Sequence, residues 1–350
     1  MYDFIILRMK KTSLIILTLI CFQQKAFLQN AAYSKLQFTS KEKERISIDS
    51  IYHYKFNAFD SAGKSISYYV EKLPSWLKFN VHDHSISGKA VKRGQYMIHL
   101  LASTNDTIIH QRFMLTVFNK NTINILALGN SITNGTNRFN SYRRDLWQML
   151  HHANYNFDFI GSWNKHHMGG EVPNPDFDMD HDGHSGWTTH DILSPPGWDS
   201  TRGNIHIWIQ TYTPDIVLVE LGTNDVFQCV PVKEAMNNIS EIIDILRNKN
   251  PHVKIFLALI PPLGAQWADK KLCGNDTTYI KSIEIFNKNV SRLASEKNTD
   301  ISKVITVDLF TGVHPATDMY DDIHPNDIGE KNMAESWYKA IKKYLNKIKN

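Results

Sequence analysis

The sequence predicts an α/β domain with a parallel sheet, preceded by a small all-β sandwich domain. From about residue 122 onward, continuous apolar runs alternate with amphipathic stretches of helical period, which is typical of a parallel sheet covered by helices on both faces. From about residue 36 to 118, short alternating segments are separated by turn residues, which indicates a β-sandwich. A chain of 350 residues with 42% hydrophobic residues is long enough to bury both cores.

The first region, residues 36–118, contains five segments of strand character, which span residues 52–56, 65–70, 84–88, 96–101 and 113–118. We expect Trp76 to pack in the core of this region rather than to serve as a platform for a sugar. The region resembles the cadherin-like or immunoglobulin-like modules attached to bacterial exported proteins. The resemblance depends on Tyr54, Ala58-Phe-Asp60, Gly63, Leu73-Pro-Ser-Trp-Leu-Lys-Phe79, Ile86-Ser-Gly88 and Gly94-Gln-Tyr96.

The second region, residues 122–350, follows a short polar linker at 119–122. Its predicted strands span residues 123–128, 157–161, 216–221, 253–260 and 304–310. Its predicted helices span residues 141–152, 232–249, 279–297 and 330–347. In open parallel sheets, ligands bind beyond the carboxyl ends of the strands. We therefore expect functional residues in the segments that directly follow the strands.

One of these segments holds a candidate nucleophile, Ser131. The first strand stops at Gly129, and Ser131 follows two residues later, ahead of a helix-like stretch. A strand that breaks sharply presents a serine hydroxyl at the sheet edge, where backbone N–H groups can face a developing negative charge. The alternative is an ordinary turn in which Ser131 only caps a helix.

A serine nucleophile needs a base, and the base needs an acid that orients it. The last loop supplies both, because His324 is a natural base and Asp321, three residues earlier, can hold its other ring nitrogen. The predicted catalytic residues are therefore Ser131, Asp321 and His324. The predicted oxyanion donors are the backbone N–H groups of Ser131 and Gly186 and the side-chain amide of Asn224.

Together these segments resemble the SGNH branch of the GDSL hydrolases over about residues 122–350. Four blocks occur in the family's order: Gly129-Asn-Ser-Ile-Thr-Asn-Gly135, Gly186, Gly222-Thr-Asn-Asp225 and Asp321-x-x-His324-Pro325. The resemblance implies a flavodoxin-like three-layer α/β/α fold and ester hydrolysis by a Ser-His-Asp triad, with no cofactor. One position departs from the family's pattern, since Asn130 stands where aspartate is usual.

The segment from Asp182 to Thr188 resembles the corresponding region of carbohydrate esterases that deacetylate plant polysaccharides. We therefore expect an acetylated carbohydrate or polysaccharide substrate, with Trp187 and Asn130 as substrate-binding residues. Packing beneath the loop is an equal alternative for Trp187. Trp198, Trp208 and Trp267 are further aromatic candidates, for which core packing is the default. A short-chain lipase or thioesterase, and a non-catalytic carbohydrate-binding or adhesion protein, stay open as alternative functions.

No metal site is expected. The run Asp178-x-Asp180-x-Asp182-Gly183 copies only the first half of a calcium loop, and the nearby histidines form no zinc spacing. A net charge of +4 without a long basic run also predicts no nucleic-acid partner. The sequence does not predict the oligomeric state.

The N-terminus predicts an exported protein, in the periplasm, at the cell surface or outside the cell. Met9-Lys-Lys precedes an apolar stretch at residues 12–22, which indicates a secretory signal over residues 1–26 that is too short to span a membrane. Cys21 raises the alternative of a lipid anchor, which the preceding Ile20 disfavours. Cys229 and Cys273 are a disulfide candidate in an exported protein, with two unrelated thiols as the alternative.

Overall fold

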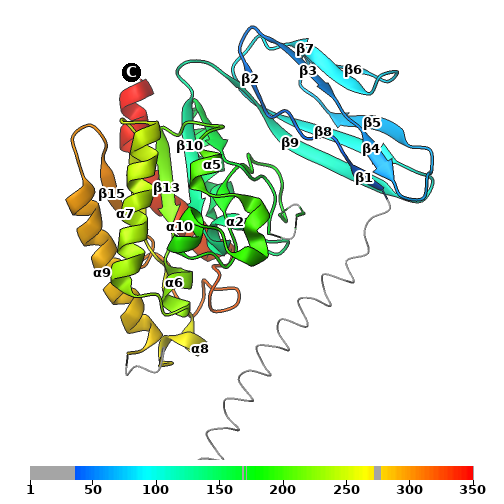
Figure 1. Cartoon of the computed structure of the whole chain (residues 1–350). Helices are drawn as coiled ribbons and strands as arrows, with labels where there is room; N and C mark the ends of the chain where they lie inside the picture. The colour runs from blue at the N-terminus through cyan, green and yellow to red at the C-terminus, as the bar shows by residue number, and fades with distance from the viewer. Residues whose placement is uncertain (1–35, 168, 171, 272–276, 350) are drawn as a thin grey trace, which may run out of the picture.

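The protein folds into two regions, which Figure 1 shows as a group of strands at the upper right and a helix-covered sheet at the left. The computed structural model describes residues 36–349 apart from residues 168, 171 and 272–276. The predicted signal sequence at residues 1–26 lies outside the described residues. Within the described part of the chain, no helix is both long and apolar enough to cross a membrane.

The first region consists of strands arranged around a single core. A four-stranded sheet in the order β2-β9-β8-β5 and a three-stranded sheet in the order β3-β7-β6 enclose this core, and β1 pairs with β4. Tyr52, Ile86 and Leu100 are fully buried between the sheets. This arrangement confirms the predicted all-β region. The strands are β1 (Leu36–Phe38), β2 (Arg45–Ser47), β3 (Ile51–Lys55), β4 (Ala58–Asp60), β5 (Ser67–Lys72), β6 (Lys78–Asn80), β7 (Ser85–Lys89), β8 (Gly94–Ser103) and β9 (Ile108–Phe118).

The second region is built on five parallel strands in the order β11-β10-β13-β14-β15. Because β11 and β13 flank β10 on opposite sides, the winding of the chain reverses at β10. Such a switch point is where open α/β sheets bind ligands. A two-residue strand, β12, pairs with the carboxyl end of β10. The strands are β10 (Ile123–Gly129), β11 (Phe157–Ile160), β12 (Asp182–Gly183), β13 (Ile216–Glu220), β14 (Lys254–Leu259) and β15 (Val304–Asp308).

Helices cover both faces of this sheet. The apolar cluster that includes Leu126 and Val217 packs against α7 and α9. The cluster that includes Ile125 and Leu218 packs against α3 and α10 on the other face. Successive strand residues point to opposite faces, so one strand serves both layers, and the predicted α/β/α architecture is confirmed. The helices are α2 (Ser131–Asn134), α3 (Tyr142–His152), α4 (Thr189–Leu193), η1 (Gly197–Arg202), α5 (Ile205–Trp208), α6 (Thr223–Phe227), α7 (Val232–Lys249), α8 (Ala265–Ala268), α9 (Tyr279–Lys297) and α10 (Asp327–Lys349).

Side chains from both regions form the joint between them. Arg45 on β2 pairs with Asp158 on β11 at 2.8 Å and donates to Asn124 Oδ1 on β10 at 2.9 Å. Gln95 on β8 donates to Asp178 Oδ2 at 2.9 Å. Burial raises the pKa of both Asp158 and Asp178. Since Asn124 and Asp158 lie near the amino ends of their strands, this joint stands at the opposite edge of the sheet from the carboxyl ends.

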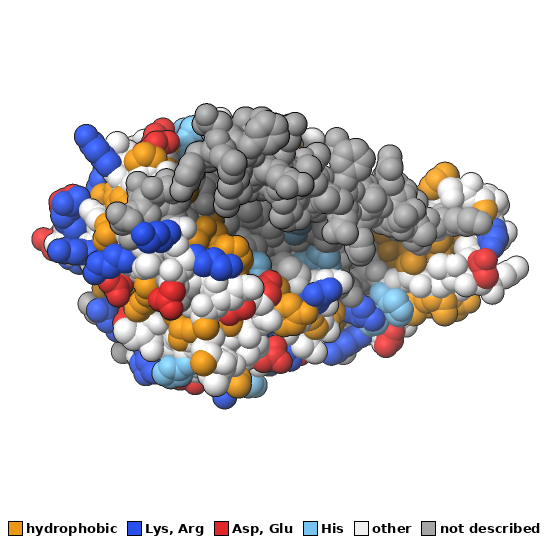
Figure 2. Space-filling view, turned by 90° about the horizontal axis from the view of Figure 1, so that it is seen from below, with side chains coloured by type: hydrophobic (Ala, Val, Ile, Leu, Met, Phe, Trp, Pro, Cys, Tyr) orange, Lys and Arg blue, Asp and Glu red, His pale blue; other side chains and the backbone are white. Residues whose placement is uncertain are grey.

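The face of the molecule in Figure 2 carries Lys and Arg side chains interspersed with Asp and Glu wherever it is not covered in grey. Hydrophobic side chains are scattered between them. Single exposed apolar side chains on a charged surface are ordinary for a folded protein. The expectation that the protein binds no nucleic acid stays a prediction.

Candidate active site

Ser131 lies on a tight turn between β10 and α2. Asn130 caps this short helix, because its side-chain oxygen accepts a hydrogen bond from the backbone N–H of Ile132 at 2.8 Å. Gly129 is required at the turn, since a Cβ atom there would lie 2.7 Å from the carbonyl oxygen of Glu220. The turn therefore holds Ser131, partly exposed, at the carboxyl edge of the sheet.

Ser131, His324 and Asp321 form one hydrogen-bonded chain. His324 Nε2 lies 2.8 Å from Ser131 Oγ, and His324 Nδ1 lies 2.9 Å from each carboxylate oxygen of Asp321. The backbone N–H groups of Ile323 and His324 also donate to Asp321, at 3.2 and 2.8 Å. The loop before α10 thus places a base within hydrogen-bond reach of the serine, and an acid within reach of the base.

The carboxyl group of Asp321 is ionised in this arrangement. Burial acts to raise its pKa, but the hydrogen bond and charge of His324 outweigh that effect, and the pKa lies below its usual value. A carboxylate only accepts hydrogen bonds, so it holds the Nδ1 atom of His324 as a donor. The Nε2 atom then faces the hydroxyl of Ser131 as an acceptor.

The loops with the predicted oxyanion donors leave the sheet beside Ser131. Gly129 on β10 pairs in register with Gly183 on β12 and with Glu220 on β13. All three segments therefore begin at the same level of the sheet. Within a few residues each of them reaches a predicted functional residue.

Gly186 and Asn224 are held together by contacts between their loops. Asn224 Nδ2 donates to the carbonyl oxygen of Trp187 at 2.8 Å, and Gln228 Nε2 donates to the carbonyl oxygen of Gly186 at 3.2 Å. Gly186 has a φ of +81°, a left-handed conformation that favours glycine. The structure thus brings the glycine and asparagine segments side by side at the edge where Ser131 emerges.

Comparison with known proteins identifies the family. Residues 127–331, more than half of the chain, match the model of the GDSL-like Lipase/Acylhydrolase family. The chain belongs to this family. The resemblance to the GDSL hydrolases is confirmed, and at the level of the family the second region is a carboxylic ester hydrolase.

Several relatives of this GDSL hydrolase are esterases. The chain is 32% identical to a multidomain esterase of Ruminococcus flavefaciens over 238 residues, which cover 64% of this chain and 29% of that protein. It is similar to an acetyl esterase mutant solved with acetate ion, at 26% identity and a TM-score of 0.52 over 65% of this chain and 100% of that one. It is also similar to a family 3 carbohydrate esterase of Clostridium thermocellum, at 28% identity and a TM-score of 0.51 over 65% of this chain and 98% of that one. The chain spans between 29% and 60% of the length of the curated relatives it matches.

Asp225 anchors the asparagine segment of this GDSL hydrolase. Its carboxylate accepts hydrogen bonds from the backbone N–H of Thr189 at 3.0 and 3.2 Å and from the Thr189 hydroxyl at 2.6 Å. Burial raises the pKa of Asp225 to about 6, although the hydrogen bonds from Thr189 act to lower it. Because these bonds tie α6 to the start of α4, the placement of Asn224 depends on a buried neighbour.

Glu220 is a buried carboxyl group beneath the serine turn that the sequence analysis did not identify. Asn130 Nδ2 and Thr133 Oγ1 each donate to one of its oxygens at 3.4 Å. Burial raises the pKa of Glu220 from 4.5 to about 8, despite these bonds, so the group is protonated at neutral pH. A signal was present in the sequence, since Glu220 is the one charged residue of an apolar strand and stands just before the asparagine block.

Phe139 was also missed. Its ring stacks on the ring of His324, with centroids 5.2 Å apart and planes at 28°. Phe139 is almost fully buried, so it limits how far the imidazole can turn. No sequence signal distinguishes it from an ordinary core aromatic residue.

The structure corrects the prediction that Trp187 and Asn130 contact substrate. Trp187 has no exposed surface, its ring stacks on His184 at 4.3 Å, and its Nε1 atom donates to Asp199 at 3.1 Å. Packing beneath the loop is therefore the correct interpretation of this residue. Asn130 is 1% exposed, because its side chain is used in the helix cap and in the bond to Glu220.

Two other aromatic rings are exposed at the site instead. Trp198 is 65% exposed, not packed in the core as expected, and its ring would lie 3.6 Å from a Cβ atom added to Gly186. Tyr320 is 47% exposed, and its backbone N–H donates to the carbonyl oxygen of His324 at 2.7 Å. The Trp198 ring therefore lies beside the glycine segment, and the Tyr320 ring lies 6.2 Å from the ring of Phe139, which stacks on His324.

The acidic run that copies half a calcium loop does not form a cage. Asp178 accepts from the backbone N–H of Phe159 at 3.1 Å, and Asp182 accepts from the backbone N–H of Ser162 at 3.0 Å. The carboxyl groups of Asp178 and Asp182 thus each accept a hydrogen bond from the backbone. Within the described ranges, none of these residues belongs to a group of three close metal-ligating side chains.

The predicted disulfide joins Cys229 to Cys273, and the structure describes the first of these two residues. Cys229 is disulfide-bonded. Cys273, its predicted partner, lies outside the described residues. The pairing of the two therefore stays a prediction.

Proposed function

We propose that this chain is an exported serine esterase that removes acetyl or other short acyl groups from carbohydrate esters, with a polysaccharide as its natural substrate. The observation that carries the proposal is the hydrogen-bonded chain of Ser131, His324 and Asp321, with links of 2.8 and 2.9 Å. It lies at the switch point of the sheet, beside two further loops. Export rests on the signal sequence predicted over residues 1–26.

The reaction proceeds through an acyl-enzyme. His324 Nε2 takes the proton of Ser131 Oγ as this oxygen attacks the ester carbonyl, and Asp321 stabilises the resulting imidazolium. His324 then passes the proton to the departing sugar oxygen, which leaves an acetyl group on Ser131. A water molecule gives a proton to His324 and attacks this acetyl group. Release of acetate returns the proton to Ser131 Oγ.

The tetrahedral intermediate places a negative charge on the former carbonyl oxygen. Its donors are the backbone N–H groups of Ser131 and Gly186 and the side-chain amide of Asn224. An amide nitrogen carries two hydrogens, and Asn224 gives one of them to the carbonyl of Trp187. That bond fixes the amide, and the second hydrogen serves the oxyanion.

The substrate class is supported by the exposed rings and by the relatives. Trp198, beside Gly186, and Tyr320, whose ring lies against Phe139, are both largely exposed, and a sugar ring next to the scissile ester would stack on such a surface. Similar proteins include an acetyl esterase and carbohydrate esterases of family 3. We therefore assign stacking on the sugar to Trp198 in the first place.

Kinetics on two ester substrates test the proposal. With p-nitrophenyl acetate and with acetylated xylan, Ser131→Ala is expected to lower turnover by roughly 10⁴-fold or more, as loss of a serine nucleophile does elsewhere. Ser200→Ala, at an exposed serine of η1, is the matched control and should keep wild-type rates. If wild type and Ser131→Ala are equally inert on acetyl and butyryl esters, the chain is not an esterase of this kind.

A substrate panel separates the alternatives. Faster turnover of longer acyl chains or thioesters than of acetylated sugars would favour a lipase or thioesterase. Polysaccharide binding by wild type and by Ser131→Ala, without acetate release from either, would favour an adhesion or carbohydrate-binding protein. Mass spectrometry of the mature chain secreted from a bacterial host tests export, and retention of residues 1–26 would contradict it.

A further inference from the structure

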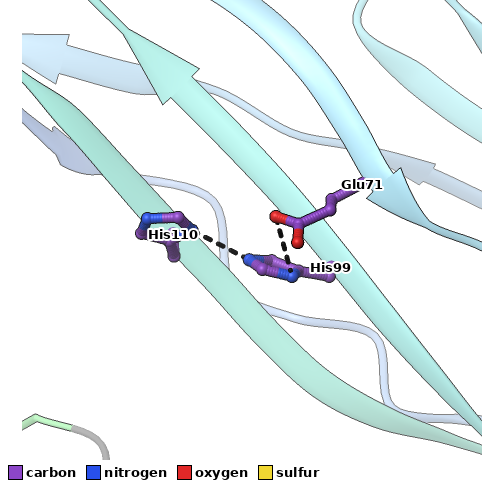
Figure 3. Close-up of side chains that lie close together, drawn as sticks. All are labelled: Glu71, His99 and His110. Carbon is purple, nitrogen blue, oxygen red and sulfur yellow. Dashed lines mark hydrogen bonds and ion pairs between the residues drawn. The ribbon is translucent and has the colours of Figure 1, made fainter.

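A group of three potential metal ligands lies on the four-stranded sheet of the first region, residues 36–118, away from the active site. This first region is called the β-region below. Figure 3 shows Glu71, His99 and His110 projecting toward one another from three neighbouring strands, β5, β8 and β9. One ligand atom from each residue can be chosen so that all three atoms lie within 4.8 Å of one another. The cluster plays no part in the esterase chemistry proposed above.

The strand register brings the two histidines together. His99 pairs with Arg112 and Leu101 pairs with His110 on the adjacent antiparallel strand. His99 and His110 are therefore diagonal neighbours on one face of the sheet, a spacing that long side chains bridge. The Nε2 atom of His99 lies 2.9 Å from the Nδ1 atom of His110.

A β-bulge places the third residue. The pairing of β5 with β8 shifts between Val70 and Lys72, so Glu71 is the extra residue of the bulged strand. Bulges of this kind re-aim a side chain. The carboxylate of Glu71 reaches the Nδ1 atom of His99 at 3.2 Å.

These contacts prepare His99 as a ligand. When its Nδ1–H donates to Glu71, the lone pair of a neutral imidazole is at Nε2 and faces His110.

We propose that Glu71, His99 and His110 bind a divalent transition-metal ion of the zinc class on the outer face of this sheet. Two nitrogen ligands of tetrahedral zinc are roughly 3.3 Å apart, given Zn–N bonds of about 2.0–2.1 Å. The two imidazoles need only separate by a few tenths of an ångström from their 2.9 Å contact. Glu71, whose side chain is 57% exposed, can swing in as the third ligand, and water completes the shell.

The expected role of the ion is to cross-link three strands. Glu71, His99 and His110 belong to three separate strands, so a shared ion would tie β5, β8 and β9 together. An ion that binds only the folded chain raises the unfolding temperature with increasing metal concentration.

Calorimetric titration with Zn²⁺ tests the site. The full chain is used without a histidine tag, after treatment with a chelator. We expect one saturable zinc per wild-type chain at this site, and about 10- to 100-fold weaker binding in His110→Gln and in Glu71→Gln. His82→Gln, at an exposed histidine of the same region, is the matched control and should bind like wild type.

Thermal unfolding in chelator and in excess Zn²⁺ separates loss of zinc binding from loss of the fold. His110 and Glu71 are exposed, so both variants should unfold at the wild-type temperature in chelator, and only wild type and His82→Gln should gain several degrees with zinc. Two results would overturn the proposal. One is wild type that shows no saturable binding, and the other is zinc binding that both ligand variants retain unchanged.

Discussion

Replacing Glu220 with glutamine should make the protein more stable at alkaline pH. Glu220 is fully buried and its pKa is raised from 4.5 to about 8, first by burial. Between these two values the folded chain holds a proton that the unfolded chain has lost. Stability from this group is therefore complete below about pH 4.5, falls as the pH rises, and is lost above about pH 8. The glutamine of Glu220→Gln does not ionise, so the stability of this variant does not fall with rising pH on account of position 220.

The size of the effect follows from the shift. At about 1.4 kcal/mol per pKa unit, ionising Glu220 in the folded state costs about 5 kcal/mol at high pH. Between pH 5 and pH 9 the free energy of unfolding of Glu220→Gln should rise by about 4 kcal/mol relative to wild type. Glutamine retains the shape of the protonated carboxyl group and accepts the bond from Asn130. The variant is therefore expected to fold normally at pH 5.

Urea unfolding at several pH values measures this difference. Seven of the eight tryptophans lie after residue 122, so their fluorescence reports on the region that contains Glu220. Glu296→Gln is the matched control, because Glu296 lies on α9 with a side chain 63% exposed. Its difference from wild type should stay near zero throughout. If the difference for Glu220→Gln is also constant from pH 5 to pH 9, Glu220 does not hold a proton in the folded state.

Three further substitutions test the active site and its support. Asn224→Ala should lower kcat on p-nitrophenyl acetate by about 10²–10³-fold with little change in KM, because its amide serves the transition state; a change confined to KM would contradict that role. Asp321→Asn should lower kcat by roughly 10³–10⁴-fold, since it removes the charge that orients His324, and near-normal kcat would refute this function of the acid. Arg143→Met should lower the free energy of unfolding by about 3 kcal/mol or more in urea titrations, because the buried guanidinium donates to three backbone carbonyls; unchanged stability would show that those carbonyls find other donors.

The long elements of the α/β region could be predicted because their signals are local. Residues 232–249 and 279–297 form helices with the predicted bounds. Pro231 and Thr278 mark their starts, and the apolar period marks their length. The short elements β12 and α2 were not predicted, because they depend on pairing with β10 and on packing under the serine turn rather than on any repeating pattern.

The catalytic arrangement could be predicted for a different reason. The serine and asparagine blocks come directly after strands β10 and β13, and the carboxyl ends of parallel strands meet at one edge. The structure places Ser131, His324 and Asp321 in contact as this reasoning requires, and their catalytic role stays a prediction. Burial of an individual ring is not local. Trp187 is buried and bonded to Asp199 of a later segment. The residues around Trp187 in the sequence do not indicate this contact.

The β-region shows the same limit at a finer scale. Short segments of strand character between turn residues predicted strands near β3, β5, β7, β8 and β9, and buried and exposed side chains alternate along β3. The bulge at Glu71 depends on how β5 pairs with β8. The contact of His99 with His110 likewise depends on the register of two strands. Neither could be read from one strand alone.

The joint between the two regions bears on how this protein can be divided. The polar linker at residues 119–122 is the obvious place to cut the chain. A fragment that begins at residue 122 would nevertheless leave Asp158 and Asp178 without Arg45 and Gln95, their partners from the β-region. Recombination at that linker would thus separate the buried carboxyl groups of Asp158 and Asp178 from the donors that stabilise them. The two regions are better regarded as one inherited unit, and exchange of the β-region for another module would have to carry the partners of these acids with it.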